Sequence, residues 1–152
     1  MPTDYATDEI IPAFAVSDWL RNQSAVTAVV GSSGGLPNIY EKAFPIRFEK
    51  IERIPKSILV RHSNSGTRFE ESPLIDVELD VFCYGPDPLQ ARQVYTVAAV
   101  ALRGMANEIL SPAPNRCIQV KVGVGADLTD PDTGWDLVLF SARVVMTNVA
   151  SS

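Results

Sequence analysis

The feature that most constrains the fold is an abrupt change of hydrophobic period in the middle of the chain. In the stretch DVELDVFC, residues 76–83, apolar and acidic side chains alternate. A period of two predicts a strand with one buried face and one polar face. Asp76, Glu78 and Asp80 would then share the polar face, at a spacing of about 7 Å from one to the next.

A helical pattern follows after only a few residues. Asp87 is suited to be its N-cap and Pro88 its first residue, and Pro112 and Pro114 lie beyond its end. The spacing predicts an amphipathic helix that packs on a sheet. The apolar residues that recur at intervals of three and four are Leu89, Val94, Val97, Ala98, Ala101, Leu102, Met105 and Ile109.

The remaining elements are shorter. Before the long helix we expect helices over 10–23 and 25–30 (the second capped by Ser24), a glycine-rich loop over 31–35, a strand over 38–41, an irregular charged stretch over 42–56, and strands over 57–62 and 74–84. After the long helix we expect a strand over 116–125, a turn over 127–134 and a closing strand over 135–148. Asn64, Ser65 and Gly66 supply turn residues for a hairpin loop that extends to Pro73.

This order predicts an α+β fold: a mostly antiparallel sheet with a long helix packed on one face and an N-terminal helical segment. Residues 1–9 are expected to form a flexible N-terminal arm. Residues 10–149 are expected to form a single domain.

Composition narrows the function. The 152 residues are 46% hydrophobic, which is enough for an ordinary core, and carry a net charge of −5. A negative chain is poorly suited to tight binding of nucleic-acid phosphates. Cys83 and Cys117 are too few for a disulfide scaffold and favour buried free thiols. We see no signal-peptide pattern and no apolar stretch of membrane-spanning length.

The patterns that catalysis or metal binding requires are missing. The single histidine, His62, has no neighbour at zinc-ligand spacing, and no nucleophile–base motif is present. The loop over 31–35 lacks the lysine of a phosphate-binding loop, and DLTDPDTG at 127–134 has turn residues without calcium-ligand spacing. We therefore expect no enzyme activity and no cofactor, and look for function on the surface.

Four stretches carry a likeness to a known family: DWLRNQSAVTAVVGSSGGLPNIYEKAFP, IPKSILVRHS, VELDVFCYGPDPLQARQVYTVAAVAL and DPDTGWDLVLFSARVVM. Together they resemble the tail-completion or tail-terminator proteins of long-tailed phages and related tail-like particles. The likeness covers about residues 15–146, and the order of the elements carries it more than any one residue. The charged stretch over 42–56 is longer than the family pattern.

The resemblance implies a structural role. Proteins of this family form a ring, usually of six subunits, on the last ring of tail-tube protein; the ring stops tube growth and meets the neck of the head. It implies a virion protein of the tail or neck, assembled in the host cytoplasm, whose partners are its own copies, the major tail tube protein and a head-completion, stopper or connector protein. DNA passes through the lumen without sequence-specific binding, and no membrane is involved.

Such a ring places different faces of neighbouring subunits in contact. The acidic face of Asp76, Glu78 and Asp80 could meet basic side chains of a neighbour, or line the channel and keep DNA from adhering. The basic candidates are Arg61, Arg68 and Arg92.

The segment over 63–73 is a second candidate contact. Phe69 is its one large apolar residue, flanked by Arg68, Glu70 and Glu71. It could anchor a mobile arm on a neighbour or on the tube, or the segment could be an ordinary solvated loop.

Two other functions remain open. The chain could be another neck, head-completion or minor tail protein. Less in keeping with the sequence, it could be a small enzyme or ligand-binding domain whose pocket lies between the long helix and the sheet.

Overall fold

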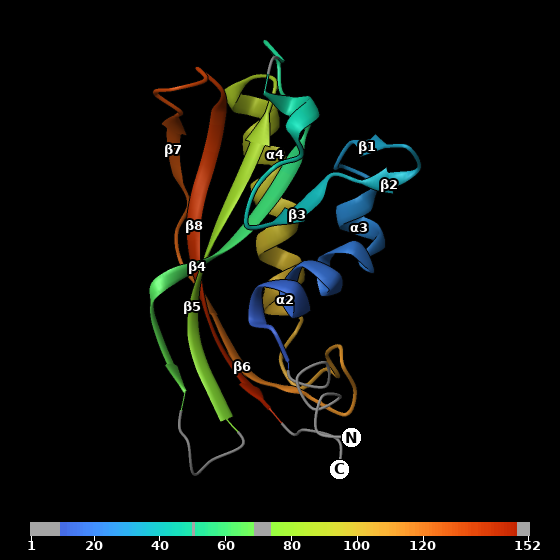
Figure 1. Cartoon of the computed structure of the whole chain (residues 1–152), viewed down its shortest axis with the longest axis vertical. Helices are drawn as coiled ribbons and strands as arrows, with labels where there is room; N and C mark the ends of the chain where they lie inside the picture. The colour runs from blue at the N-terminus through green and yellow to red at the C-terminus, as the bar shows by residue number, and fades with distance from the viewer. Residues whose placement is uncertain (1–9, 50, 69–73, 149–152) are drawn as a thin grey trace.

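A mostly antiparallel sheet forms the centre of the computed structural model, which describes residues 10–49, 51–68 and 74–148, with the backbone alone for 64–68 (Figure 1). Its strands run in the order β3-β4-β5-β8-β6, and β7 also pairs with β8. The predicted α+β class is confirmed. The strands are β3 (Ile39–Glu41), β4 (Ser57–Arg68), β5 (Leu74–Gly85), β6 (Cys117–Val122), β7 (Ala126–Thr129) and β8 (Asp136–Thr147).

The strand β5 is the middle of the sheet. It pairs antiparallel with β4 on one side and, along its whole length, with β8 on the other. The short strand β3 runs parallel to β4 at one edge. At the opposite edge β6 pairs with the C-terminal half of β8 and β7 with its N-terminal half. Together β6 and β7 therefore form one long edge.

The helices lie on one face of this sheet. They are α2 (Pro12–Arg21), α3 (Ser24–Thr27) and α4 (Pro88–Arg103), of which α2 and α4 contact the strands and α3 packs against α4 (Figure 1). Asp87 caps α4 as predicted, because its carboxylate accepts a hydrogen bond from the backbone N–H of Gln90 at 2.8 Å. A Cβ atom at Gly85 would lie 2.4 Å from the backbone nitrogen of Ala91, so β5 passes directly into α4 at a glycine.

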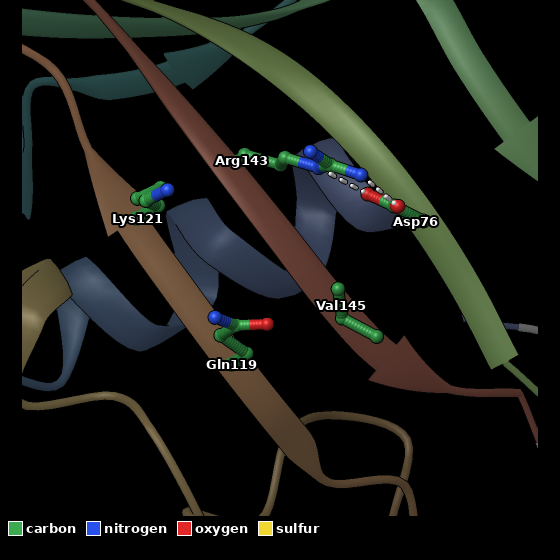
Figure 2. A pocket seen from close by; sticks show the side chains of 5 residues that line it. All are labelled: Asp76, Gln119, Lys121, Arg143 and Val145. Carbon is green, nitrogen blue, oxygen red and sulfur yellow. Dashed lines mark hydrogen bonds and ion pairs between the residues drawn. The ribbon is translucent and has the colours of Figure 1, made fainter.

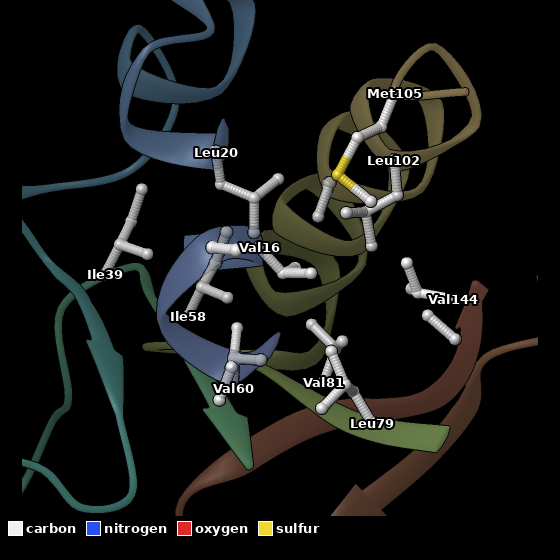
Figure 3. Packing of buried hydrophobic residues seen from close by; sticks show 14 of the residues in the cluster. Val16, Leu20, Ile39, Ile58, Val60, Leu79, Val81, Leu102, Met105 and Val144 are labelled. Carbon is white, nitrogen blue, oxygen red and sulfur yellow. The ribbon is translucent and has the colours of Figure 1, made fainter. Parts of the chain in front are cut away.

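The main core fills the space between the helices and the sheet (Figure 3). The inward face of β5 contributes Val77, Leu79, Val81 and Cys83, which confirms the predicted alternation. The buried face of α4 is also confirmed at its centre. It consists of Ala91, Val94, Ala98 and Leu102, and Met105 continues it just after the helix.

Three predicted core positions are wrong. Leu89 is 70% exposed, because it lies two residues before Ala91 and so about 200° around the helix from the buried face. Ile109 is exposed because the helix ends at Arg103. Phe14, which the sequence places with Ala15 and Trp19 in an apolar stripe of the helix over 10–23, is exposed, since the stripe that α2 buries contains Ala13, Val16 and Leu20.

A second, aromatic core covers part of the opposite sheet face. The segment over 42–56, predicted as irregular, contains a short 3-10 helix, η2 (Ile46–Phe48), and buries Phe48 and Ile54. The indole N–H of Trp135 donates to the backbone oxygen of Ile51 at 3.1 Å. The cluster consists of Phe48, Ile54, Leu59, Tyr84, Trp135 and Leu137, with Tyr40, Phe44, Ile51, Phe82 and Leu139 packed around it.

Some predicted loops form strands. The loop over 31–35 is the turn of a small hairpin, β1 (Ser32–Ser33) with β2 (Leu36–Pro37), and Gly34 and Gly35 adopt positive φ in it. Residues 126–129 are strand β7, so the predicted turn over 127–134 starts only at Asp130.

Two local predictions differ for reasons of register and capping. The strand β4 continues to Arg68, because His62 pairs with Leu79 and Gly66 with Val77, so that Ser63–Ser65 oppose the single residue Glu78. The turn-like residues therefore form a bulge rather than a hairpin turn. Ser24 is the first residue of α3 and not its N-cap, which is Gln23.

Candidate interaction surface

The outward face of the sheet divides into two halves. Near the C-terminal end of β5 it is covered by the aromatic core, and near its N-terminal end it carries the predicted acidic row. Asp76, Glu78 and Asp80 are each partly exposed on this half. The structure thus places all three on one face, as the alternation predicted.

Basic side chains from β8 and β6 lie on the same sheet face as Asp76 (Figure 2). The guanidinium of Arg143 on β8 donates to both carboxylate oxygens of Asp76, at 2.9 Å from Nε and 2.5 Å from Nη2. Lys121 on β6 is the register partner of Arg143. Together with Gln119 and Val145, these three side chains line a shallow hollow of about 160 Å³.

The ion pair changes the titration of both partners. The hydrogen bonds from Arg143 hold the pKa of Asp76 below its ordinary value, against a smaller opposing effect of burial. The same bonds raise the pKa of Arg143. Asp76 is therefore a carboxylate stabilised in its charged form, which is unsuited to act as a general acid near neutral pH.

Arg61 on β4 faces the other end of the row. It is the register partner of Asp80, and its guanidinium lies over the ring of Phe82 at 5.5 Å from the centroid. The row of three carboxylates is thus matched by three cations of the same chain, Arg61, Lys121 and Arg143. The formal charges of these six side chains add to zero, so this half of the face is a mixed-charge surface and not an acidic one.

Arg92 lies elsewhere. It projects from α4 on the helical side, donates to both carboxylate oxygens of Asp127 on β7 at 3.0 and 2.9 Å, and lies over the ring of Tyr95. Arg92 therefore has an intramolecular partner. Its role at a subunit interface stays a prediction.

The segment over 63–73 is only partly described. Arg68 is the last residue of β4 and pairs in register with Ile75. Phe69, Glu70 and Glu71 lie outside the described residues, so the proposed arm and its aromatic anchor stay predictions.

A large apolar hollow lies on the outer side of the helices. It has a volume of about 460 Å³, is open to solvent and lies between α4 and the α2–α3 segment. Trp19, Val97 and Val100 supply much of its wall, and the indole of Trp19 is held by a hydrogen bond to the backbone oxygen of Ala101 at 3.0 Å. The space between α4 and the sheet, where the alternative of a ligand-binding domain or enzyme would have its pocket, is filled by the core.

The two cysteines are free and buried, as predicted. Burial raises the pKa of Cys83 far above its ordinary value and that of Cys117 to about 11. Burial likewise raises the pKa of Tyr84 to about 12. None of these groups is an activated nucleophile at neutral pH.

The sequence places Lys56, Arg61, Lys121 and Arg143 on other predicted strands, where they could pair with the carboxylates across neighbouring strands; which strands are neighbours follows only from the sheet order. Lys121 and Arg143 face outward from β6 and β8, which lie on the same side of β5. The sequence signal for this orientation is the alternation within 117–122 and 136–147.

Among the described residues, no helix combines the length and the apolar character needed to span a membrane. Within the same residues there is no group of three or more acidic, histidine or cysteine side chains arranged to hold a metal ion.

Comparison with known proteins finds similar chains among solved structures. No protein-family model and no curated protein matches the chain. A chain from the virion of a native gene transfer agent particle is similar, with a TM-score of 0.61 and 14% identity over 89% of this chain and 93% of that one. At this identity the likeness establishes a shared fold. A second solved chain aligns over 100% of this chain and 99% of its own at a TM-score of 0.49 and 13% identity, and we draw no argument from it.

Proposed function

We propose that this chain is a structural subunit of a phage-like virion that forms a ring on the end of the tail tube. The ring ends tube growth and joins the tail to the neck of the head. The observation that carries the proposal is the fold shared with a virion chain along almost the whole length of both. The resemblance of the sequence to tail-terminator proteins supports the specific position. We expect the ring to contain six subunits, a number that electron microscopy can measure.

The mixed-charge half of the sheet face suits a channel through which DNA passes. Phosphates bind to clustered, unpaired cations. Here Arg143 is held by Asp76, and Arg61 lies opposite Asp80. Each of these cations has a carboxylate nearby that competes with a phosphate, so DNA would slide past without being retained.

The decisive experiment removes the chain from the particle. Inactivating its gene should give headless tails of abnormal length, seen by negative-stain electron microscopy. A neck or head-completion protein would instead leave tails of normal length that fail to attach. Tails of normal length, attached to heads, would refute a role in the virion.

A triple substitution tests the role of the acidic row against catalysis. Asp76→Ala, Glu78→Ala and Asp80→Ala together should give a folded protein with altered assembly or DNA delivery. A metal- or carboxylate-dependent turnover that this variant abolishes would overturn the structural role. The matched control is Glu52→Ala, which changes an exposed carboxylate outside the row.

A second candidate function rests on the hollow between α4 and α2–α3. Its volume of about 460 Å³ falls within the range of small-molecule sites. Saturable binding of an apolar ligand that Val100→Asp abolishes, with normal tails in the absence of the chain, would favour this reading. Val124→Asp is the matched control, since Val124 is exposed and does not line the hollow.

A further inference from the structure

The two long edges of the sheet carry complementary features. One edge consists of β7 with the start of α4, and the other of β3 with the β1–β2 hairpin and η2; they lie on opposite sides of the molecule (Figure 1). An edge strand presents unpaired backbone groups, and proteins usually cover or blunt such edges. We therefore compared what each edge exposes.

The first edge is apolar and acidic. All four residues of β7 are exposed, and among the described residues β7 pairs with β8 alone. Three large apolar side chains are exposed around it: Leu128 (46%), Leu89 (70%) and Val124 (91%). Asp136 pairs in register with Thr129 of β7, and Asp132 lies in the turn that follows β7. Neither carboxylate forms an ion pair with any described residue. We call Leu89, Val124, Leu128, Asp132 and Asp136 the acidic edge.

The second edge is apolar and basic. A hollow of about 340 Å³ beside β3 is walled by Leu36, Pro37, Ile39 and Tyr40. Arg47 and Arg21 lie at its rim, and Arg21 is ion-paired with Glu41 at 2.5 Å, so the basic character of this edge comes from Arg47 and Lys42. Leu36 is 71% exposed and Ile46 is 80% exposed. Arg47 hydrogen-bonds the hydroxyl of Tyr40, and neither Arg47 nor Lys42 forms an ion pair with any described residue. We call Leu36, Ile46, Lys42 and Arg47, with this hollow, the basic edge.

We propose that the acidic edge of one copy of this chain docks on the basic edge of the next. Leu128 and Val124 would enter the hollow beside β3, and Lys42 and Arg47 would face Asp132 and Asp136. Both apolar patches would leave water, and the charges would fix the orientation. The occupant is a second copy because the two edges carry charges of opposite sign, and each exposes apolar surface that the other can cover.

The contact is heterologous, because two different patches meet. Repeated around an axis it closes into a ring, and without closure it makes a filament. The inference deepens the proposed ring and rests on it. It also moves the predicted contact from Asp76, Glu78 and Asp80, which have cations of their own chain nearby, to the two sheet edges.

Cysteine crosslinking tests the contact. Leu36→Cys and Leu128→Cys are prepared separately, mixed, and treated with a short bis-maleimide; the natural cysteines are buried and stay unmodified. The mixture should give a crosslinked dimer that neither variant gives alone. In a double variant the products should form a ladder that ends at the ring size. The matched control is Val100→Cys, 61% exposed on α4 away from both edges, mixed with Leu36→Cys.

A charge swap makes the test independent of crosslinker geometry. Arg47→Glu on the Leu36→Cys chain should reduce the mixed product to the control level, and Asp132→Lys with Asp136→Lys on the Leu128→Cys chain should restore it. Circular dichroism verifies that each variant is folded. The proposal is overturned if either single variant alone gives as much crosslinked dimer as the mixture of Leu36→Cys and Leu128→Cys. It is also overturned if that mixture gives no more dimer than the control mixture of Val100→Cys and Leu36→Cys.

The outcomes separate this inference from the proposed function. Abnormal tails in the absence of the chain, combined with no edge-specific crosslink in solution or in particles, would leave the tail function standing and refute the edge contact. Normal tails combined with an edge-specific crosslink would refute the tail function and leave the contact.

Discussion

Replacing Leu102 with alanine tests how α4 is held on the sheet. Its side chain is completely buried in the main core, near Met105 and Val144 (Figure 3). The change removes three carbons, worth about 2.4 kcal/mol at about 0.8 kcal/mol per buried CH₂. Each 40 Å³ of cavity that remains adds about 1 kcal/mol.

Met105 limits the second contribution, because an unbranched side chain can move into part of the space. We therefore expect Leu102→Ala to lower the free energy of unfolding by about 3–4 kcal/mol. For a chain of this length the melting temperature would fall by roughly 6–16 °C. Urea denaturation followed by circular dichroism gives the free energy directly, and an unchanged m-value would show that the unfolded state is unaffected.

Leu89→Ala is the matched control, since it is the same substitution in the same helix at a side chain that is 70% exposed. It should change the free energy of unfolding by less than about 0.5 kcal/mol. Equal destabilisation by the two substitutions would refute the assignment of the helix face.

Gly85→Ala should destabilise by about 1–3 kcal/mol, because its Cβ would overlap the backbone of Ala91 in α4. Gly104 has a negative φ, and a Cβ there would make only ordinary contacts, 3.5 Å or more from the backbone oxygens of Ala101 and Val100, so Gly104→Ala should be neutral or stabilising. Thermal melts that rank the two variants alike would contradict this. The stabilisation from the Asp76–Arg143 pair should be complete above the ordinary pKa of an aspartate and disappear as pH falls through the lowered pKa of Asp76. Acid denaturation of Arg143→Met, which should converge with the wild type at low pH, measures this; a difference that persists there would exclude the pair as its cause. Cys117 should resist iodoacetamide at about pH 8 until the chain unfolds, and rapid labelling of the native protein, read by mass spectrometry, would disprove its burial.

Local sequence determined those elements in which a periodic pattern coincides with a boundary signal. The strand β5 and the centre of α4 were predictable because one face of each packs against the same core, and Asp87 with Pro88 marks the start of the helix. The acidic row followed from the same alternation. A period of two or of 3.6 is a property of neighbouring residues, so it can be read without knowledge of distant contacts.

The tertiary structure decided what depends on residues that are distant in sequence. The aromatic core joins η2 to Tyr84 and Trp135, and its residues in 42–56 show no period because an irregular segment has no repeating face. The extension of β4 past His62 depends on pairing with β5, which stabilises strand residues in a segment whose composition favours a turn. Which cations of the same chain lie beside the three carboxylates was also decided by the tertiary structure. It depends on which strands lie beside β5, and only the sheet order brings Arg61 next to Asp80 and Arg143 next to Asp76.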